Sequence, residues 1–72
     1  MERMLLYSLE RRRAIRLMYV DGGGALRQVT AVVTAMKDGR VKLYVLRPPQ
    51  DLEIDISDIL SADYRKGDEG QE

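Results

Sequence analysis

The chain has 72 residues, with twelve basic and twelve acidic side chains and neither cysteine nor histidine. A domain of this length buries only a modest core. Without cysteine there are no disulfides and no thiolate metal ligands, and without histidine the chain lacks the commonest metal ligand and the usual general base at neutral pH. We therefore expect no enzyme, no cofactor and no metal site.

No apolar run approaches the roughly 20 residues that span a bilayer, and the apolar stretch near the N-terminus is too short for a signal peptide. We therefore expect a cytoplasmic protein with no membrane partner. The charges are unevenly distributed, because residues 1–48 hold ten of the twelve basic side chains and residues 49–72 hold eight of the twelve acidic ones. Such asymmetry indicates either a basic binding face or strands that pair and neutralise each other.

The residues from Glu2 to about Arg12 predict a short helix. Leu5 and Leu9 lie four positions apart and share one helix face. A glutamate at the start and arginines at the end suit the helix dipole. A helix of this length does not persist alone in water, so we expect its leucines to dock on the open end of a β-barrel.

Residues 14–20 predict a strand in which Ile15, Leu17 and Tyr19 share one face. The glycine-rich stretch 21–24 predicts a turn. Residues 25–36 predict a second strand, long enough to need a bend or a bulge.

The second strand and a third one, over residues 40–47, predict a hairpin whose loop length decides which faces coincide. A two-residue loop at Asp38-Gly39 places Val41 opposite Met36 and turns the apolar faces of the two strands apart. We therefore predict a three-residue loop over 37–39, with Gly39 in the left-handed position. This register pairs Val41 with Ala35, Leu43 with Val33, and Val45 with Ala31.

Residues 50–56 predict a fourth strand, with Leu52, Ile54 and Ile56 facing inward. A four-residue loop over 47–50 aligns these side chains with the apolar face of the third strand. It pairs Val45 with Leu52, Leu43 with Ile54, Val41 with Ile56, Lys42 with Asp55, and Tyr44 with Glu53.

The last part of the chain predicts a closing strand. Residues 57–59 predict a single helical turn capped by Ser57, and residues 60–65 predict a fifth strand that pairs with the first. Residues 66–72 contain no apolar side chain and predict a disordered acidic tail. Together the elements predict one domain over residues 1–65, of the α+β class and mainly β. We expect an N-terminal helix on a five-stranded antiparallel SH3/Sm-like barrel, because closure removes exposed strand edges.

Two stretches resemble the YolD-like family of small bacterial proteins: Ile15-Arg16-Leu17-Met18-Tyr19 followed by Asp21-Gly22, and Ile54-Asp55-Ile56-Ser57-Asp58-Ile59. The tyrosine-ended first strand, Arg27 and the tripeptide Leu43-Tyr44-Val45 resemble the WYL domain, although the tryptophan of that tripeptide is replaced by Leu43 and a basic residue near the end by Asp58. The resemblance implies an Sm-type barrel and, for the WYL domain, regulation linked to a ligand or to nucleic acid.

The densest basic cluster is at the predicted helix end. Arginines that contact phosphates would give salt-dependent affinity for nucleic acid, whereas the alternative is a solvated helix end that suits the dipole. The candidate nucleic-acid-binding residues are Arg11, Arg12, Arg13, Arg16 and Arg27. Lys42, Tyr44 and Arg47 also interleave basic and aromatic character, but the acidic fourth strand beside them would repel phosphates.

Four apolar residues are predicted to point outward and form an interface with a second copy or another protein: Met18, Val20, Tyr44 and Leu46. The alternative is that the helix covers them. The alternate carboxylates of residues 51–55 stand about 7 Å apart along a strand, too far apart to hold one metal ion without further ligands. We therefore expect a binding or regulatory module that binds nucleic acid through the helix end, or else a protein-interaction or homo-oligomeric module.

Overall fold

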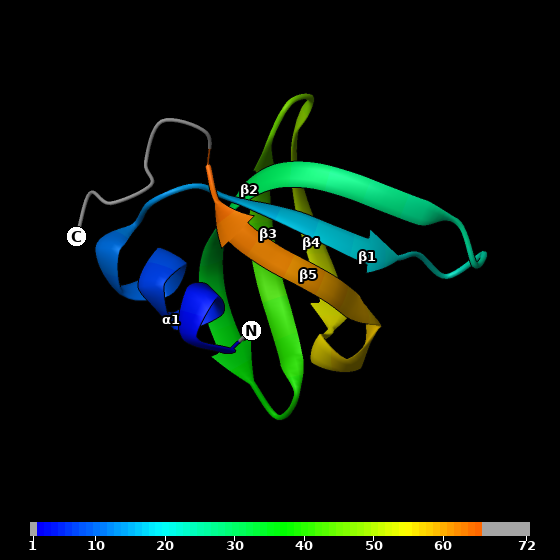
Figure 1. Cartoon of the computed structure of the whole chain (residues 1–72), viewed down its shortest axis with the longest axis horizontal. Coiled ribbons are helices and arrows are strands. Elements are labelled where there is room, and N and C mark those ends of the chain that lie inside the picture. The colour runs from blue at the N-terminus through cyan, green and yellow to red at the C-terminus, as the bar shows by residue number, and fades with distance from the viewer. Residues whose placement is uncertain (1, 66–72) are drawn as a thin grey trace.

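One helix and five antiparallel strands make up the part of the chain that the computed structural model describes, residues 2–65 (Figure 1). The elements are α1 (Glu2–Arg11), β1 (Ile15–Val20), β2 (Leu26–Lys37), β3 (Arg40–Leu46), β4 (Pro49–Asp55), the 3₁₀ helix η1 (Ile56–Asp58) and β5 (Ile59–Tyr64). The α+β, mainly β class is confirmed. The predicted disorder of residues 66–72 falls outside the described residues.

The strands form one sheet in the order β4-β3-β2-β1-β5. The long strand β2 pairs with β1 through its first half and with β3 through its second half, and Ala31 lies opposite both Ile15 and Val45. The predicted pairing of the fifth strand with the first is confirmed, with Ile15 opposite Tyr64. Within residues 2–65, β4 and β5 are the two ends of the sheet, so the closure of a barrel stays a prediction.

The predicted three-residue loop between β2 and β3 is wrong. Lys37 pairs with Arg40, and the two loop residues Asp38 and Gly39 have φ angles of 53° and 77°, which are typical of a type I′ turn. The apolar faces still coincide, because a bulge at Thr34 shifts the register between Val33 and Ala35. The predicted pairs of Leu43 with Val33 and Val45 with Ala31 are therefore confirmed, whereas Val41 lies opposite Met36.

The predicted loop between β3 and β4 is too long by two residues. Leu46 pairs with Pro49, so that only Arg47 and Pro48, joined by a cis peptide bond, form the connection. The prediction places both prolines in the loop, but a proline is tolerated as the first residue of an edge strand because no ladder donor is needed there. The register of β4 against β3 differs from the predicted one by two residues, and because this number is even the inner faces still match. The observed pairs are Leu43 with Leu52, Val41 with Ile54, Lys42 with Glu53, and Tyr44 with Asp51.

The core lies between the inner face of the sheet and α1, which packs against β2 and β5. Leu5 of the helix is fully buried, as are the inner residues of β1, β2 and β3. Ser8 is the one buried polar residue among those described. The predicted serine cap of the turn after β4 is wrong, because η1 begins after Asp55 and has no side-chain cap hydrogen bond.

Candidate functional site

Three strand ends meet at the middle of β2. β1 begins at Ile15, opposite Ala31, and β3 approaches its end at Val45, opposite the same residue. β5 ends at Tyr64, opposite Ile15 on the other side of β1. The residues that flank these ends therefore gather in one region, and several of them are arginines: Arg12, Arg13, Arg16, Arg47 and Arg65.

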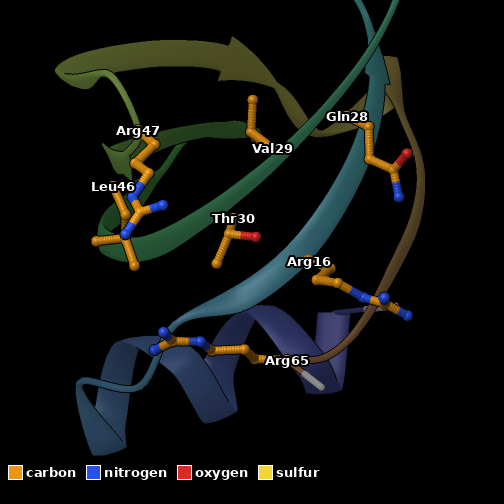
Figure 2. A pocket seen from close by; sticks show the side chains of 7 residues that line it. All are labelled: Arg16, Gln28, Val29, Thr30, Leu46, Arg47 and Arg65. Carbon is orange, nitrogen blue, oxygen red and sulfur yellow. The ribbon is translucent and has the colours of Figure 1, made fainter.

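The largest hollow in this region has a volume of about 630 Å³. It is lined by Arg16, Gln28, Val29, Thr30, Leu46, Arg47 and Arg65. In Figure 2 the guanidinium ends of Arg47 and Arg65 extend to one side of Thr30, while that of Arg16 extends to the opposite side. Positive charge is thus distributed along the hollow and is not concentrated at one point.

Two smaller hollows adjoin the first. One, of about 400 Å³, shares Leu46 and Arg65 with it and adds Arg12, Arg13, Ala14 and Val32. The other, of about 370 Å³, shares Arg12 and Val32 with the second and extends to Leu9, Val33, Thr34 and Tyr44. We call the three together the basic groove.

No acidic side chain of residues 2–65 lines the basic groove. Its apolar lining includes Val32 and Leu46, and Tyr44, 40% exposed, lies at one end. Two carboxylates border it, because Asp63 lies opposite Arg16 in the β1–β5 ladder and Asp51 lies opposite Tyr44. The arrangement offers cations and apolar surface side by side and no nucleophile–base pair.

Arg12 enters the groove from a backbone conformation that normally favours glycine. Its φ angle is 55°, and the amide of Arg13 donates to the carbonyl of Ser8 at 3.2 Å. This bond, together with a left-handed residue before the donor, is the helix-ending motif whose left-handed position usually holds glycine. A non-glycine residue there stores strain of about 1–2 kcal/mol, which identifies Arg12 as a candidate functional residue.

The structure brings three of the five predicted basic residues into the groove: Arg12, Arg13 and Arg16. Arg11 lies on α1, with its guanidinium 5.9 Å from the ring centre of Tyr7. Arg27 lies opposite Tyr19, near the β1–β2 turn, where its Nε donates to Asp21 at 2.7 Å. Figure 1 shows this turn at the end of the sheet away from α1. Arg27 is therefore outside the groove.

Asp21 organises the β1–β2 turn. Its carboxylate accepts the Arg27 hydrogen bond and, at 2.9 Å each, the amides of Gly23 and Ala25. The bond from Arg27, with those from Ala25 and Gly23, lowers the pKa of Asp21 below its ordinary value. Gly24 has a φ angle of 84°, a conformation that glycine adopts without strain.

The four predicted interface residues divide into two sets. Tyr44 and Leu46 line the basic groove. Met18 and Val20 lie on β1, where Val20 pairs with Leu26, which is 61% exposed. Next to them on β5, a register shift leaves Leu60 unpaired, and its side chain is 55% exposed. The apolar residues of this second set are Met18, Val20, Leu26 and Leu60.

The acidic strand β4 is partly neutralised by its neighbour. Arg40 donates to Glu53 at 2.9 Å and to Asp55 at 2.8 Å, and its hydrogen bond lowers the pKa of Glu53. Lys42 also lies opposite Glu53. Among the described residues, no three metal-ligating side chains come together.

The sequence pattern disfavours Arg47, because of the acidic strand beside it, and gives no signal for Arg65, yet both arginines line the largest hollow. Arg47 directly follows the last residue of β3, and Arg65 directly follows the last residue of β5. That position carries information only once the topology is known, because β3 and β5 end beside each other only if both flank the β1–β2 pair.

No family model, no curated protein and no solved structure matches this chain. In the part of the chain that the structure describes, no helix is both long and apolar enough to cross a membrane.

Proposed function

We propose that this chain is a non-catalytic nucleic-acid-binding module that binds through the basic groove. The observation that carries the proposal is the set of five arginines around three adjoining hollows without an acidic residue from positions 2–65 in their lining. The predicted helix-end cluster is thereby extended by Arg47 and Arg65.

The lining suits a single strand better than a duplex. Guanidinium groups form forked hydrogen bonds to phosphate oxygens, and each contact adds salt-dependent affinity. Bases need apolar or aromatic surface for stacking, which Leu46, Val32 and Tyr44 supply in the same groove. A single tyrosine provides little base discrimination, so we expect weak sequence preference.

Fluorescence anisotropy with labelled RNA and DNA oligonucleotides of about 12 nucleotides, at about 50 mM NaCl, tests the proposal. We expect binding by the parent protein and losses of roughly tenfold for both Arg47→Glu and Arg65→Glu, because each replaces a phosphate contact by a repulsive charge. The matched control is Lys37→Glu, which makes the same change in net charge at an exposed position outside the groove.

Two results would overturn the proposal. One is the absence of binding at low salt. The other is an equal loss for Lys37→Glu and the two groove variants, which would show attraction by overall charge and not by the groove.

A second candidate function is self-association through Met18, Val20, Leu26 and Leu60. The observation in its favour is that Leu26 on β2 and Leu60 on β5 are both exposed, on the two strands that flank β1. Clustered apolar surface marks interfaces. Size-exclusion chromatography with light scattering would show a dimer or larger species that Leu26→Glu dissociates. A strict monomer at high concentration would rule this function out.

The finer features of the fold belong to the same proposal. We propose an SH3/Sm-like barrel related to the WYL and YolD-like families, with a regulatory role in the cytoplasm. The short connection η1, three residues long, supports closure because it carries the chain directly from the end of β4 to the start of β5.

A further inference from the structure

An acidic segment follows directly on a residue of the basic groove. Residues 66–72, with the sequence KGDEGQE, carry three carboxylates, Asp68, Glu69 and Glu72, and one lysine. They are joined to Arg65, which lines two of the three hollows. The segment's carboxylates are therefore covalently linked, within seven residues, to an arginine of the groove.

We propose that residues 66–72 occupy the basic groove and compete with nucleic acid for it, so that the chain carries its own inhibitor. This inference rests on the proposed function, which supplies the competitor. Asp68 is three residues beyond Arg65, a reach of at most about 11 Å. A tether this short holds the carboxylates near the groove at an effective concentration in the millimolar range.

The charges within residues 2–65 favour the groove as the place where these carboxylates bind. Arg27 already pairs with Asp21, and Arg40 pairs with Glu53 and Asp55. No carboxylate of the same residues pairs with Arg12, Arg16, Arg47 or Arg65. Carboxylates bind guanidinium groups by the same forked geometry as phosphates, so both occupants would use the same arginines.

The test uses the full chain with a neutral-tail variant, Asp68→Asn/Glu69→Gln/Glu72→Gln, which keeps the length of the segment. Its matched control is Glu2→Gln/Asp38→Asn/Asp58→Asn, which removes three exposed carboxylates outside the groove. With the labelled oligonucleotides at about 50 mM NaCl, we expect the neutral-tail variant to bind roughly 3–10-fold more tightly than the parent. The control should change affinity less than twofold, and the difference should vanish at about 0.5 M NaCl because of screening.

A second measurement locates the segment without any nucleic acid. Amide chemical shifts of the parent and the neutral-tail variant should differ at Arg16, Thr30 and Leu46 in the groove and agree at Leu26 and Arg27 near the β1–β2 turn. Unchanged groove shifts would overturn the proposal, and so would equal gains in affinity for the neutral-tail variant and its control.

The outcomes separate the two proposals. If the parent and the neutral-tail variant bind the oligonucleotides equally, the competition is overturned and the proposed function stands. If none of the three proteins binds at any salt concentration, the proposed function fails, and the competition fails with it. Changed groove shifts together with tighter binding support both.

Discussion

Ser8 joins the helix to the sheet with a side chain that is fully buried. Its hydroxyl donates to the carbonyl of Arg13 at 2.6 Å and accepts from the amide of Val33 at 2.9 Å. β1 begins opposite Ala31, so the amide of Val33 lies beyond the reach of that strand, and Ser8 supplies the acceptor that it lacks. Ser8 on the helix thus satisfies a backbone amide of β2 at the point where the pairing with β1 has ended.

We predict that Ser8→Ala lowers the free energy of unfolding by about 1–3 kcal/mol, because it leaves a buried amide and a carbonyl without a partner. Urea unfolding followed by circular dichroism would measure the change. Ser57→Ala is the control, since Ser57 is exposed and makes no cap bond, and its effect should stay within about 0.5 kcal/mol. Equal effects of the two substitutions would contradict the role of Ser8.

Arg12 combines backbone strain with a place in the groove, so stability and binding should respond oppositely to its replacement. We predict that Arg12→Gly raises the free energy of unfolding by about 1 kcal/mol, because glycine adopts the left-handed conformation without strain. The same variant should bind oligonucleotides several-fold more weakly. Arg12→Ala separates the two effects, since it removes the charge and keeps the strain. A binding loss without any gain in stability for Arg12→Gly would refute the strain.

Asp21 should titrate at a lower pH than an ordinary aspartate. Its pKa is lowered by the hydrogen bond from Arg27 and by two backbone amides, so the stability that these bonds contribute is present at neutral pH. It is lost as the pH falls through the lowered pKa. Carbon-13 NMR of the carboxyl group would give the midpoint, and Arg27→Gln should move it upward. A midpoint that Arg27→Gln does not change would contradict the assignment.

At the scale of elements, the bulge at Thr34 reconciles a two-residue turn with matching apolar faces. Thr34 and Ala35 together occupy the space opposite Lys42, between the pairs Val33–Leu43 and Met36–Val41. Removing one of the two would restore a regular ladder with the same pairs and the same inner face. In the sequence as it stands the bulge is what brings Val33 opposite Leu43, and a chain one residue shorter would reach the same pairs without the added twist and bend.

We predict that deletion of Thr34 leaves a cooperatively folded protein, destabilised by about 1–3 kcal/mol, because the bend and the hydrogen bond from Thr34 to Lys42 are lost. Deletion of Thr30 should abolish folding, since it lies in a regular ladder with β1 and its loss turns the following residues to the opposite face. Thermal unfolding and amide spectra distinguish the two. A folded Thr30 deletion, or an unfolded Thr34 deletion, would contradict this role of the bulge.

The elements themselves could be predicted from the sequence because alternation and turn residues act locally. The inner residues of the first strand, Ile15, Leu17 and Tyr19, are all buried as expected. The lengths of the two hairpin loops could not be predicted, because each depended on a feature that has no local signal in the sequence. One was a bulge four residues from the turn, and the other was a proline that begins an edge strand.

At the scale of the whole molecule, the candidate site depends on topology. The helix-end arginines form a visible cluster in the sequence, but Arg47 and Arg65 stand alone and join them only because β3 and β5 end beside the start of β1. Arg27 looked similar in the sequence and lies at the other end of β1. Whether an arginine belongs to the groove therefore depends on which strand end it flanks, and less on how close it lies in sequence to the other arginines.

The formal net charge of zero includes both the arginines of the groove and the acidic residues of segment 66–72, and the salt dependence of binding tests each contribution. Each phosphate contact with single-stranded nucleic acid contributes about −0.7 to the slope of log affinity against log salt. With Arg12, Arg16, Arg47 and Arg65 in contact, we predict a slope of about −3 for the neutral-tail variant.

The parent should give a shallower slope than the neutral-tail variant. The proposed competition requires the carboxylates of residues 66–72 to leave the arginines before nucleic acid binds, and salt would favour that step because it screens such pairs. The two effects oppose each other. Anisotropy titrations of both proteins at several salt concentrations measure the slopes, and Arg47→Gln in the neutral-tail background should reduce the magnitude by about 0.7, whereas Lys37→Gln should leave it unchanged. Parallel slopes for the parent and the neutral-tail variant would mean that no carboxylate–arginine pairs break when nucleic acid binds, and would contradict the competition.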